Sequence, residues 1–316
     1  MLIPKPRGPL SEAVFAAWRL PANDLSARLD VRPESDDDAA IPLWASYQLH
    51  YGGFEEVDED LEWHPDVLRL RASLELDLER RLRARCGGHQ QGGDFAADFF
   101  SYVDSHDGRS IAAYVQSDAD AEQVRDLLRV RSVYHLGEAD PISWVVPRLS
   151  ARTKAALMEV LYDEYGSGDP NRLHSHLFAV GMGASGLRTE YGAYVDEAPL
   201  EILEQNNAMS LFGLHRRHRG AALGHFAAFE ATSSMPSRRM VQGLERLGFP
   251  DEMVRYYTEH VEADSVHEQL AVRVLCGALL EEEPELAADV FFGAFTCMDL
   301  EDRVAGHLLH VWGALE

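Results

Sequence analysis

Three residues that can bind a metal ion recur at helical spacing toward the C-terminal end of the chain. His260, Asp264 and His267 occupy positions i, i+4 and i+7 of the segment YYTEHVEADSVHEQL, which has no Gly or Pro and is rich in helix-favouring residues. At about 100° per residue, their side chains project from one stripe of that helix. Two imidazoles and a carboxylate on one stripe would form half of a metal site. The alternatives are the polar outer face of a surface helix and a buried, hydrogen-bonded His–Asp pair.

Further residues with ligand-type side chains fall on other predicted helices. Glu230 ends the apolar segment HFAAFE. A carboxylate buried there without a partner would be costly, so Glu230 needs either a metal ion or an arginine. The remaining candidates lie at predicted helix ends: Glu138, Glu164 and His174. Each has a neighbour of similar chemistry that is an alternative: Asp140, Asp163 and His176. For Glu138, a solvated helix end is a further alternative.

Taken together, these candidates supply three imidazoles and four carboxylates from separate helices. An oxygen-rich set with a few histidines favours iron or manganese over zinc. More than six ligands are too many for one ion and suit two ions bridged by carboxylates. Ferritin-like di-iron proteins use two Glu-x-x-His motifs, but none of the 14 histidines has Glu three positions before it. A di-iron centre in this chain would therefore not have the ferritin-like arrangement.

The elements that must position these residues are helices. From about residue 117 onward, helical patterns follow one another, and Gly or Pro marks their ends. Strong strand alternation is absent there, which predicts an all-α bundle over residues 118–316. Residues 1–117 are predicted to form a mostly helical N-terminal extension of unknown role. Residues 95–115 stay open, and a short strand pair is one alternative there. The segment SSMP at 233–236 is predicted to break a helix.

Composition limits the class of function. The chain has 316 residues and a net charge of −24, which argues against binding to nucleic acid or to an anionic membrane. Its three cysteines are widely spaced and form no CxxC motif, as expected for reduced thiols in the cytoplasm. The N-terminus lacks the continuous apolar region of a signal peptide. No run approaches the roughly 18 apolar residues of a membrane span.

A cluster of positive charge stands out in this acidic chain. The segment LHRRHRGAALGH contains Arg216, Arg217 and Arg219. One interpretation is an internal network of ion pairs with the many Asp and Glu residues. The other is that these arginines bind the carboxylate of a small-molecule substrate.

The ordered set of candidate ligands resembles that of the haem-oxygenase-like di-metal oxidases and oxygenases, also described as iron-containing redox enzymes. The resemblance rests on a Glu before a His, a mid-chain Glu and a late His-x-x-x-Asp-x-x-His, and it covers roughly residues 118–316. The intervals are most similar to those of N-oxygenating members, which carry a further carboxylate on the preceding helix. The metal ligands that the resemblance implies are Glu138, Glu164, His174, Glu230, His260, Asp264 and His267.

The resemblance also implies a fold and a function. We expect a haem-oxygenase-like bundle of seven helices with two irons at its middle, O2 as co-substrate and an external reductant of unknown identity. The substrate would be an amino-acid-like or fatty-acid-like carboxylate. It would undergo N-oxygenation or oxidative C–C cleavage in a biosynthetic pathway, with no catalytic residues beyond the metal ligands. Homodimers are common among such proteins. Two other hypotheses stand beside this one: a haem-binding member of the fold, and a non-catalytic member that acts as a binding protein.

Overall fold

The computed structural model of the chain describes residues 1–20, 31–88 and 92–315, without the side chains of residues 262–266. The described residues form helices and connecting turns and contain no β-strand, so the all-α prediction is confirmed. Within the same residues, every helix is too short or too polar to cross a lipid bilayer.

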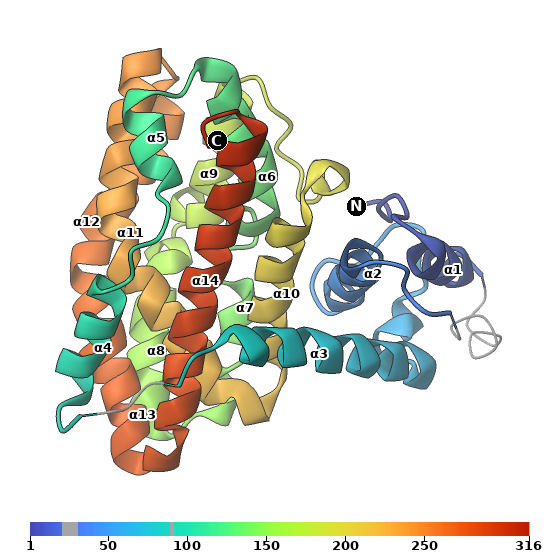
Figure 1. Ribbon diagram of the computed structural model, residues 1–316, viewed down its shortest axis with the longest axis horizontal. Helices are drawn as coiled ribbons and strands as arrows, with labels where there is room; N and C mark the ends of the chain where they lie inside the picture. The colour runs from blue at the N-terminus through green and yellow to red at the C-terminus, as the bar shows by residue number, and fades with distance from the viewer. Residues whose placement is uncertain (21–30, 89–91, 316) are drawn as a thin grey trace.

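The bundle is organised around one long helix, α11 (Arg219–Leu247). It packs against α14 (Ala287–Val311), α12 (Asp251–Gln269) and α5 (Ile111–Ser117), and these helices lie side by side in Figure 1. A π-helical segment, Leu270–Cys276, continues α12. The other bundle helices are α4 (Phe95–Asp104), α6 (Ala121–His135), α7 (Asp140–Ser143), α8 (Ala151–Glu164), α9 (His174–Ala184), α10 (Leu200–Leu214) and α13 (Gly277–Glu282).

Two glycines allow α11 and α14 to approach closely. A Cβ atom at Gly224 would collide with the backbone carbonyl of Val290, and one at Gly293 would collide with that of Ala221. The two helix backbones therefore meet without intervening side chains, and this contact fixes α11 in the middle of the bundle.

The N-terminal part contains α1 (Pro9–Trp18), α2 (Asp36–Gln48) and α3 (Pro65–Arg85). In Figure 1, α1 and α2 lie beside the bundle, and α3 crosses from them toward α14. Hydrogen bonds join the two parts: Asn207 Nδ2 on α10 donates to the carbonyl of Ala40, at 2.9 Å. The domain boundary between residues 117 and 118 stays a prediction. Helices α4 and α5 precede this boundary in the sequence, but they pack on α11 of the bundle.

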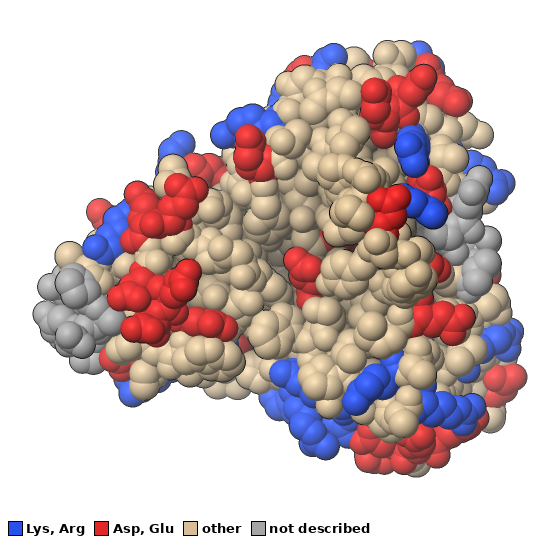
Figure 2. Space-filling model, turned by 180° about the vertical axis from the view of Figure 1, so that it is seen from behind, with Lys and Arg blue, Asp and Glu red and all other residues tan. Residues whose placement is uncertain are grey.

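On the face of the molecule that Figure 2 draws, charged side chains are scattered among a larger area of other residues. Figure 2 shows acidic and basic residues mixed over both the N-terminal part and the bundle. This mixture follows from the composition, because the 29 basic residues have 53 acidic residues as possible partners.

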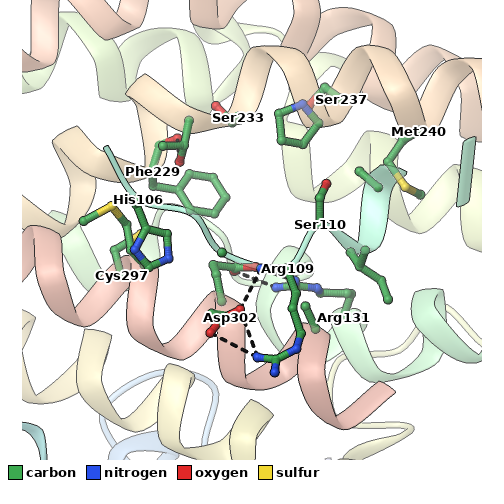
Figure 3. A pocket seen from close by; sticks show the side chains of 18 of the residues that line it. His106, Arg109, Ser110, Arg131, Phe229, Ser233, Ser237, Met240, Cys297 and Asp302 are labelled. Carbon is green, nitrogen blue, oxygen red and sulfur yellow. Dashed lines mark hydrogen bonds and ion pairs between the residues drawn. The ribbon is translucent and has the colours of Figure 1, made fainter. Parts of the chain in front are cut away.

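The structure settles residues 95–115, which the sequence left open, and shows that the predicted helix break at 233–236 is wrong. Residues 95–115 contain α4 and α5 and no strand, because the side chains of Asp94 and Ser110 cap the first turns of these helices. The segment at 233–236 does not break α11, which contains Pro236 in its interior. A proline removes only one backbone donor, and packing on several neighbouring helices outweighs that loss. Ser233 and Ser237, on either side of the proline, line a cavity shown in Figure 3.

Candidate metal centre

The first group of ligand-type side chains consists of Glu138, His174 and His260. All three are buried, and one possible ligand atom of each lies within 4.8 Å of the others. Nε2 of His260 is 3.5 Å from Oε1 of Glu138. The ring centroids of His174 and His260 are 4.5 Å apart. One carboxylate and two imidazoles could therefore reach a single cation between them.

A second group consists of Glu164, Glu230 and His267, which are also buried, with ligand atoms within 4.8 Å of one another. Nδ1 of His267 lies 3.4 Å from Oε2 of Glu230 and 3.8 Å from Oε1 of Glu164. This triad has two carboxylates and one imidazole, so it is the more oxygen-rich of the two.

Glu164 connects the two triads. Its Oε1 faces His267 of the second triad at 3.8 Å, whereas its Oε2 lies 3.0 Å from Nδ1 of His174 in the first triad. The two oxygens of one carboxylate therefore point to different groups of ligands. This is the geometry that a carboxylate bridge between two metal ions requires.

Five elements of the bundle position these side chains. Four of them supply one residue each: Glu138 just beyond α6, Glu164 at the end of α8, His174 at the start of α9 and Glu230 within α11. The fifth is α12, which carries both His260 and His267. These two histidines are about two helical turns apart on one stripe, so α12 delivers one imidazole to each triad.

In each triad, a neighbouring group of opposite charge shifts the pKa of one member. Burial alone would lower the pKa of His267, but the neighbouring Glu230 carboxylate outweighs it and raises this pKa to about 9. Burial also opposes ionisation of Glu138, but contacts with His135 and His260 hold its pKa well below the usual range. The carboxylate of Glu164 likewise outweighs burial and raises the pKa of His174, so protons on His174 and His267 offset part of the buried negative charge. Metal cations could take the place of these protons, because metal ligands must be deprotonated.

Two buried nitrogen atoms provide a further test of whether metal ions fit. Within the described part of the chain, Nδ1 of His174 and Nδ1 of His267 have no partner in hydrogen-bond geometry, although each lies close to a carboxylate. Without good hydrogen-bond geometry, these contacts offset only part of the cost of burying the two nitrogens. Cations coordinated by these nitrogens would remove that cost, so the donor set fits two metal ions.

The comparison with protein families agrees with this geometry. The family model described as "iron-containing redox enzyme" matches residues 125–302, more than half of the chain. The chain belongs to this family. The matched span contains all six residues of the two triads, and the family description fits a buried site of carboxylates and imidazoles. No curated protein matches the chain.

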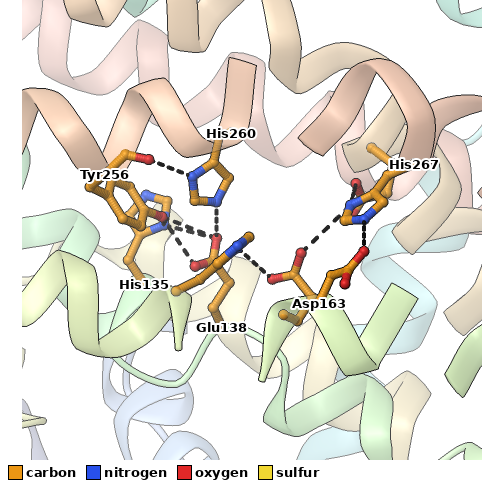
Figure 4. Close-up of polar contacts among 9 residues, drawn as sticks. His135, Glu138, Asp163, Tyr256, His260 and His267 are labelled. Carbon is orange, nitrogen blue, oxygen red and sulfur yellow. Dashed lines mark hydrogen bonds and ion pairs between the residues drawn. The ribbon is translucent and has the colours of Figure 1, made fainter. Parts of the chain in front are cut away.

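In this member of the family, two residues that sequence analysis did not single out support the first triad (Figure 4). Nδ1 of His260 lies 2.8 Å from the carbonyl oxygen of Tyr256, so its N–H donates there and leaves Nε2 facing Glu138. The Tyr256 hydroxyl lies 3.1 and 3.2 Å from the two oxygens of Glu138 and 2.8 Å from Nδ1 of His135. Their spacing in the sequence could have pointed to these two residues, because residues three or four apart are neighbours on a helix. His135 is three residues before Glu138, and Tyr256 is four residues before His260.

The alternatives to the predicted ligands are partly resolved. His176 is exposed on α9, whereas His174 is buried in the first triad. Asp163 lies beside Nε2 of His267 at 3.3 Å, and this contact leaves Nδ1 directed at Glu164 and Glu230. The side chain of Asp264 lies outside the described residues, so its predicted role as a ligand stays a prediction.

The arginine cluster lies in a network of ion pairs. Nη2 of Arg217 is 2.7 Å from Oε2 of Glu79, and Arg219 forms an ion pair with Glu283. Arg216 is exposed. These contacts agree with the interpretation of the cluster as an internal network, and a substrate-binding role for Arg216, Arg217 and Arg219 stays an untested prediction.

Proposed function

We propose that this protein is a non-haem di-iron enzyme that uses O2 to oxidise a small carboxylate-bearing metabolite, with electrons from an external reductant. The position of Glu164 between the two buried triads carries this proposal, because one carboxylate with its two oxygens aimed at separate ligand groups suits a pair of metal ions. The family description supports iron as the metal.

Each side chain has a definite task in the proposed site. Glu138, His174 and His260 would hold one iron, and Glu230 and His267 the other, with Glu164 shared between them. The irons supply the reaction with O2 that side chains cannot perform alone. Tyr256 and His135 fix the orientation of Glu138 by hydrogen bonds. The buried surroundings exclude bulk water, which strengthens the electrostatic interactions inside the site.

The haem-binding hypothesis explains the site less well. A haem iron needs one axial histidine and an apolar pocket, whereas three buried imidazoles here each lie against a carboxylate. Haem would leave these carboxylates without a partner cation. The absorbance spectrum of the protein purified with haem present distinguishes the two, because only haem binding produces a Soret band.

Anaerobic titration with ferrous iron tests the proposal. The wild-type chain is expected to bind two irons and then to consume O2 when a reductant and a carboxylate panel are supplied. Glu164→Ala removes the shared ligand, so the stoichiometry is expected to fall below two. Glu159→Ala, an exposed glutamate on the same helix, is the matched control and should still bind two. Equal iron stoichiometry in both variants would contradict the proposal.

A further inference from the structure

Figure 3 shows a cavity of about 340 Å³ in the bundle. It is bounded by the connection between α4 and α5 on one side and by α11 and α14 on the other. His106, Arg109, Ser237, Met240, Met298 and Asp302 are among its lining residues. The volume is within the range of small-molecule sites and equals that of roughly eleven water molecules at about 30 Å³ each. The cavity can therefore hold a molecule of on the order of ten non-hydrogen atoms.

The inner end of the cavity reaches the candidate metal centre. His135 lines the cavity, and its Nδ1 lies 3.4 Å from Oε1 of Glu138. Phe229 also lines it, and the same ring borders the small space enclosed by Glu138, Glu164 and Glu230. A molecule in the cavity would therefore be separated from the first triad by little more than one side chain.

The two arginines of the cavity differ in how fully they are paired. Arg131 is buried and forms two hydrogen bonds to Glu301, at 2.8 and 2.5 Å. Nη1 of Arg109 lies 3.4 and 3.5 Å from the oxygens of Asp302, distances too long for strong hydrogen bonds, and its side chain is 52% exposed. The backbone N–H of Arg109 already donates to Asp302 at 2.7 Å. The side chain of Arg109 therefore forms weaker hydrogen bonds to its carboxylate partner than the side chain of Arg131 does.

At this end of the cavity, the carboxylates already accept strong hydrogen bonds, whereas the Arg109 guanidinium can still donate them. Glu301 accepts from Arg131 and from Gln205, and Asp302 accepts from the backbone of Arg109. A guanidinium carries five N–H donors in a planar fork that matches a carboxylate. An anionic group fits here better than an ammonium group, which would compete for acceptors already in use.

We propose that this cavity is the substrate site and that Arg109 binds the substrate's carboxylate, while the apolar lining holds a short hydrocarbon chain directed at the metal centre. This inference rests on the proposed function. It also gives a role to the connection between α4 and α5, because Arg109 precedes the family match that begins at residue 125. A segment that precedes the family match would then contribute to the choice of substrate, and the helices within the match would supply the redox site.

Calorimetric titration of the iron-free, full-length protein tests this inference without reference to activity. The probes are octanoate, 2-aminooctanoate and octylamine, which distinguish a fatty-acid-like from an amino-acid-like carboxylate and both from a simple amine. At least one carboxylate is expected to bind and octylamine is not. Arg109→Met should weaken carboxylate binding at least tenfold, and Arg109→Lys should recover part of it because the charge is retained. Arg69→Met, which removes another exposed arginine that is paired with an aspartate, is the control and should bind as the wild type does.

A second variant tests the location. Ser237→Leu places a larger side chain in the cavity and should weaken octanoate binding more than butyrate binding. Unchanged affinity in Arg109→Met, binding of octylamine as tight as that of octanoate, or no carboxylate binding at all would overturn the inference. Iron stoichiometry separates this failure from failure of the proposed function, because Arg109→Met should still bind two irons.

Discussion

Among the single residues of the site, Tyr256 shows how the protein fixes its ligands. Its carbonyl orients the ring of His260, and its hydroxyl contacts Glu138 and His135. Because the side chain is buried, these contacts are shielded from competing water. Partners of this kind, which hold metal ligands in place, affect metal affinity as well as geometry.

Tyr256→Phe tests this role. Loss of the hydroxyl should weaken one of the two iron-binding steps by about 10–100-fold and leave the other unchanged, because the hydroxyl contacts the first triad alone. Competition with a chromogenic chelator measures both steps. Tyr162→Phe, which removes an exposed hydroxyl on α8, serves as the control. Two unchanged affinities in Tyr256→Phe would show that the hydroxyl does not support the site.

The sequence predicted which residue types gather but not how each ring is oriented. Helix geometry alone places His260 and His267 on one stripe. The nitrogen that each ring presents depends on contacts from elsewhere: the carbonyl of Tyr256 for His260 and the carboxylate of Asp163 for His267. Such contacts come from tertiary packing, which spacing along the chain does not encode.

Among the elements, α3 meets the start of α11 through a group of ion pairs. Glu79 on α3 receives hydrogen bonds from Arg217 and from Arg83, and His218 lies beside it. Burial alone would raise the pKa of Glu79, but the two arginines outweigh it and lower this pKa from 4.5 to about 2. A carboxyl whose pKa is lower in the folded than in the unfolded state stabilises the fold above its unfolded pKa, and this stabilisation is lost as the pH falls.

Glu79→Gln should therefore lower the free energy of unfolding at neutral pH by about 1.5–3 kcal/mol, the usual contribution of hydrogen bonds to charged groups. The difference from the wild type should stay constant between pH 7 and about pH 5 and shrink as the pH falls below about 4.5. Urea denaturation across this pH range measures it. Glu159→Gln, which changes an exposed glutamate, should match the wild type throughout. A difference for Glu79→Gln that persisted unchanged to pH 3.5 would contradict the assignment.

The helical order of the bundle could be predicted from Gly and Pro positions, and most helices end near them. Pro236 is the exception, because α11 is held on several sides by α5, α12 and α14 and tolerates one missing donor. Similarly, the pattern of apolar and aromatic residues in the short helices α4 and α5 does not distinguish helix from strand. The hydrogen bonds of their capping residues do, and only the structure shows these.

At the scale of the whole molecule, the N-terminal part and the bundle share surfaces that the sequence did not reveal. Arg217 joins the two by an ion pair with Glu79, and Arg109, in the connection between α4 and α5, lines the cavity near the candidate metal centre. Both are surface-type residues whose partners lie far away in the chain. Fold class and ligand types followed from local patterns and from the resemblance to a family. The role of residues 1–117 depends on contacts between residues far apart in the sequence, and local sequence patterns did not predict these contacts.

The most direct test of the account is a crystal structure of the ferrous protein, grown anaerobically, with anomalous difference maps recorded at the iron edge. The account predicts two peaks per chain. One should lie among Glu138, His174 and His260, the other beside Glu230 and His267, and Glu164 should contact both. A single peak, or two peaks that Glu164 does not join, would contradict it.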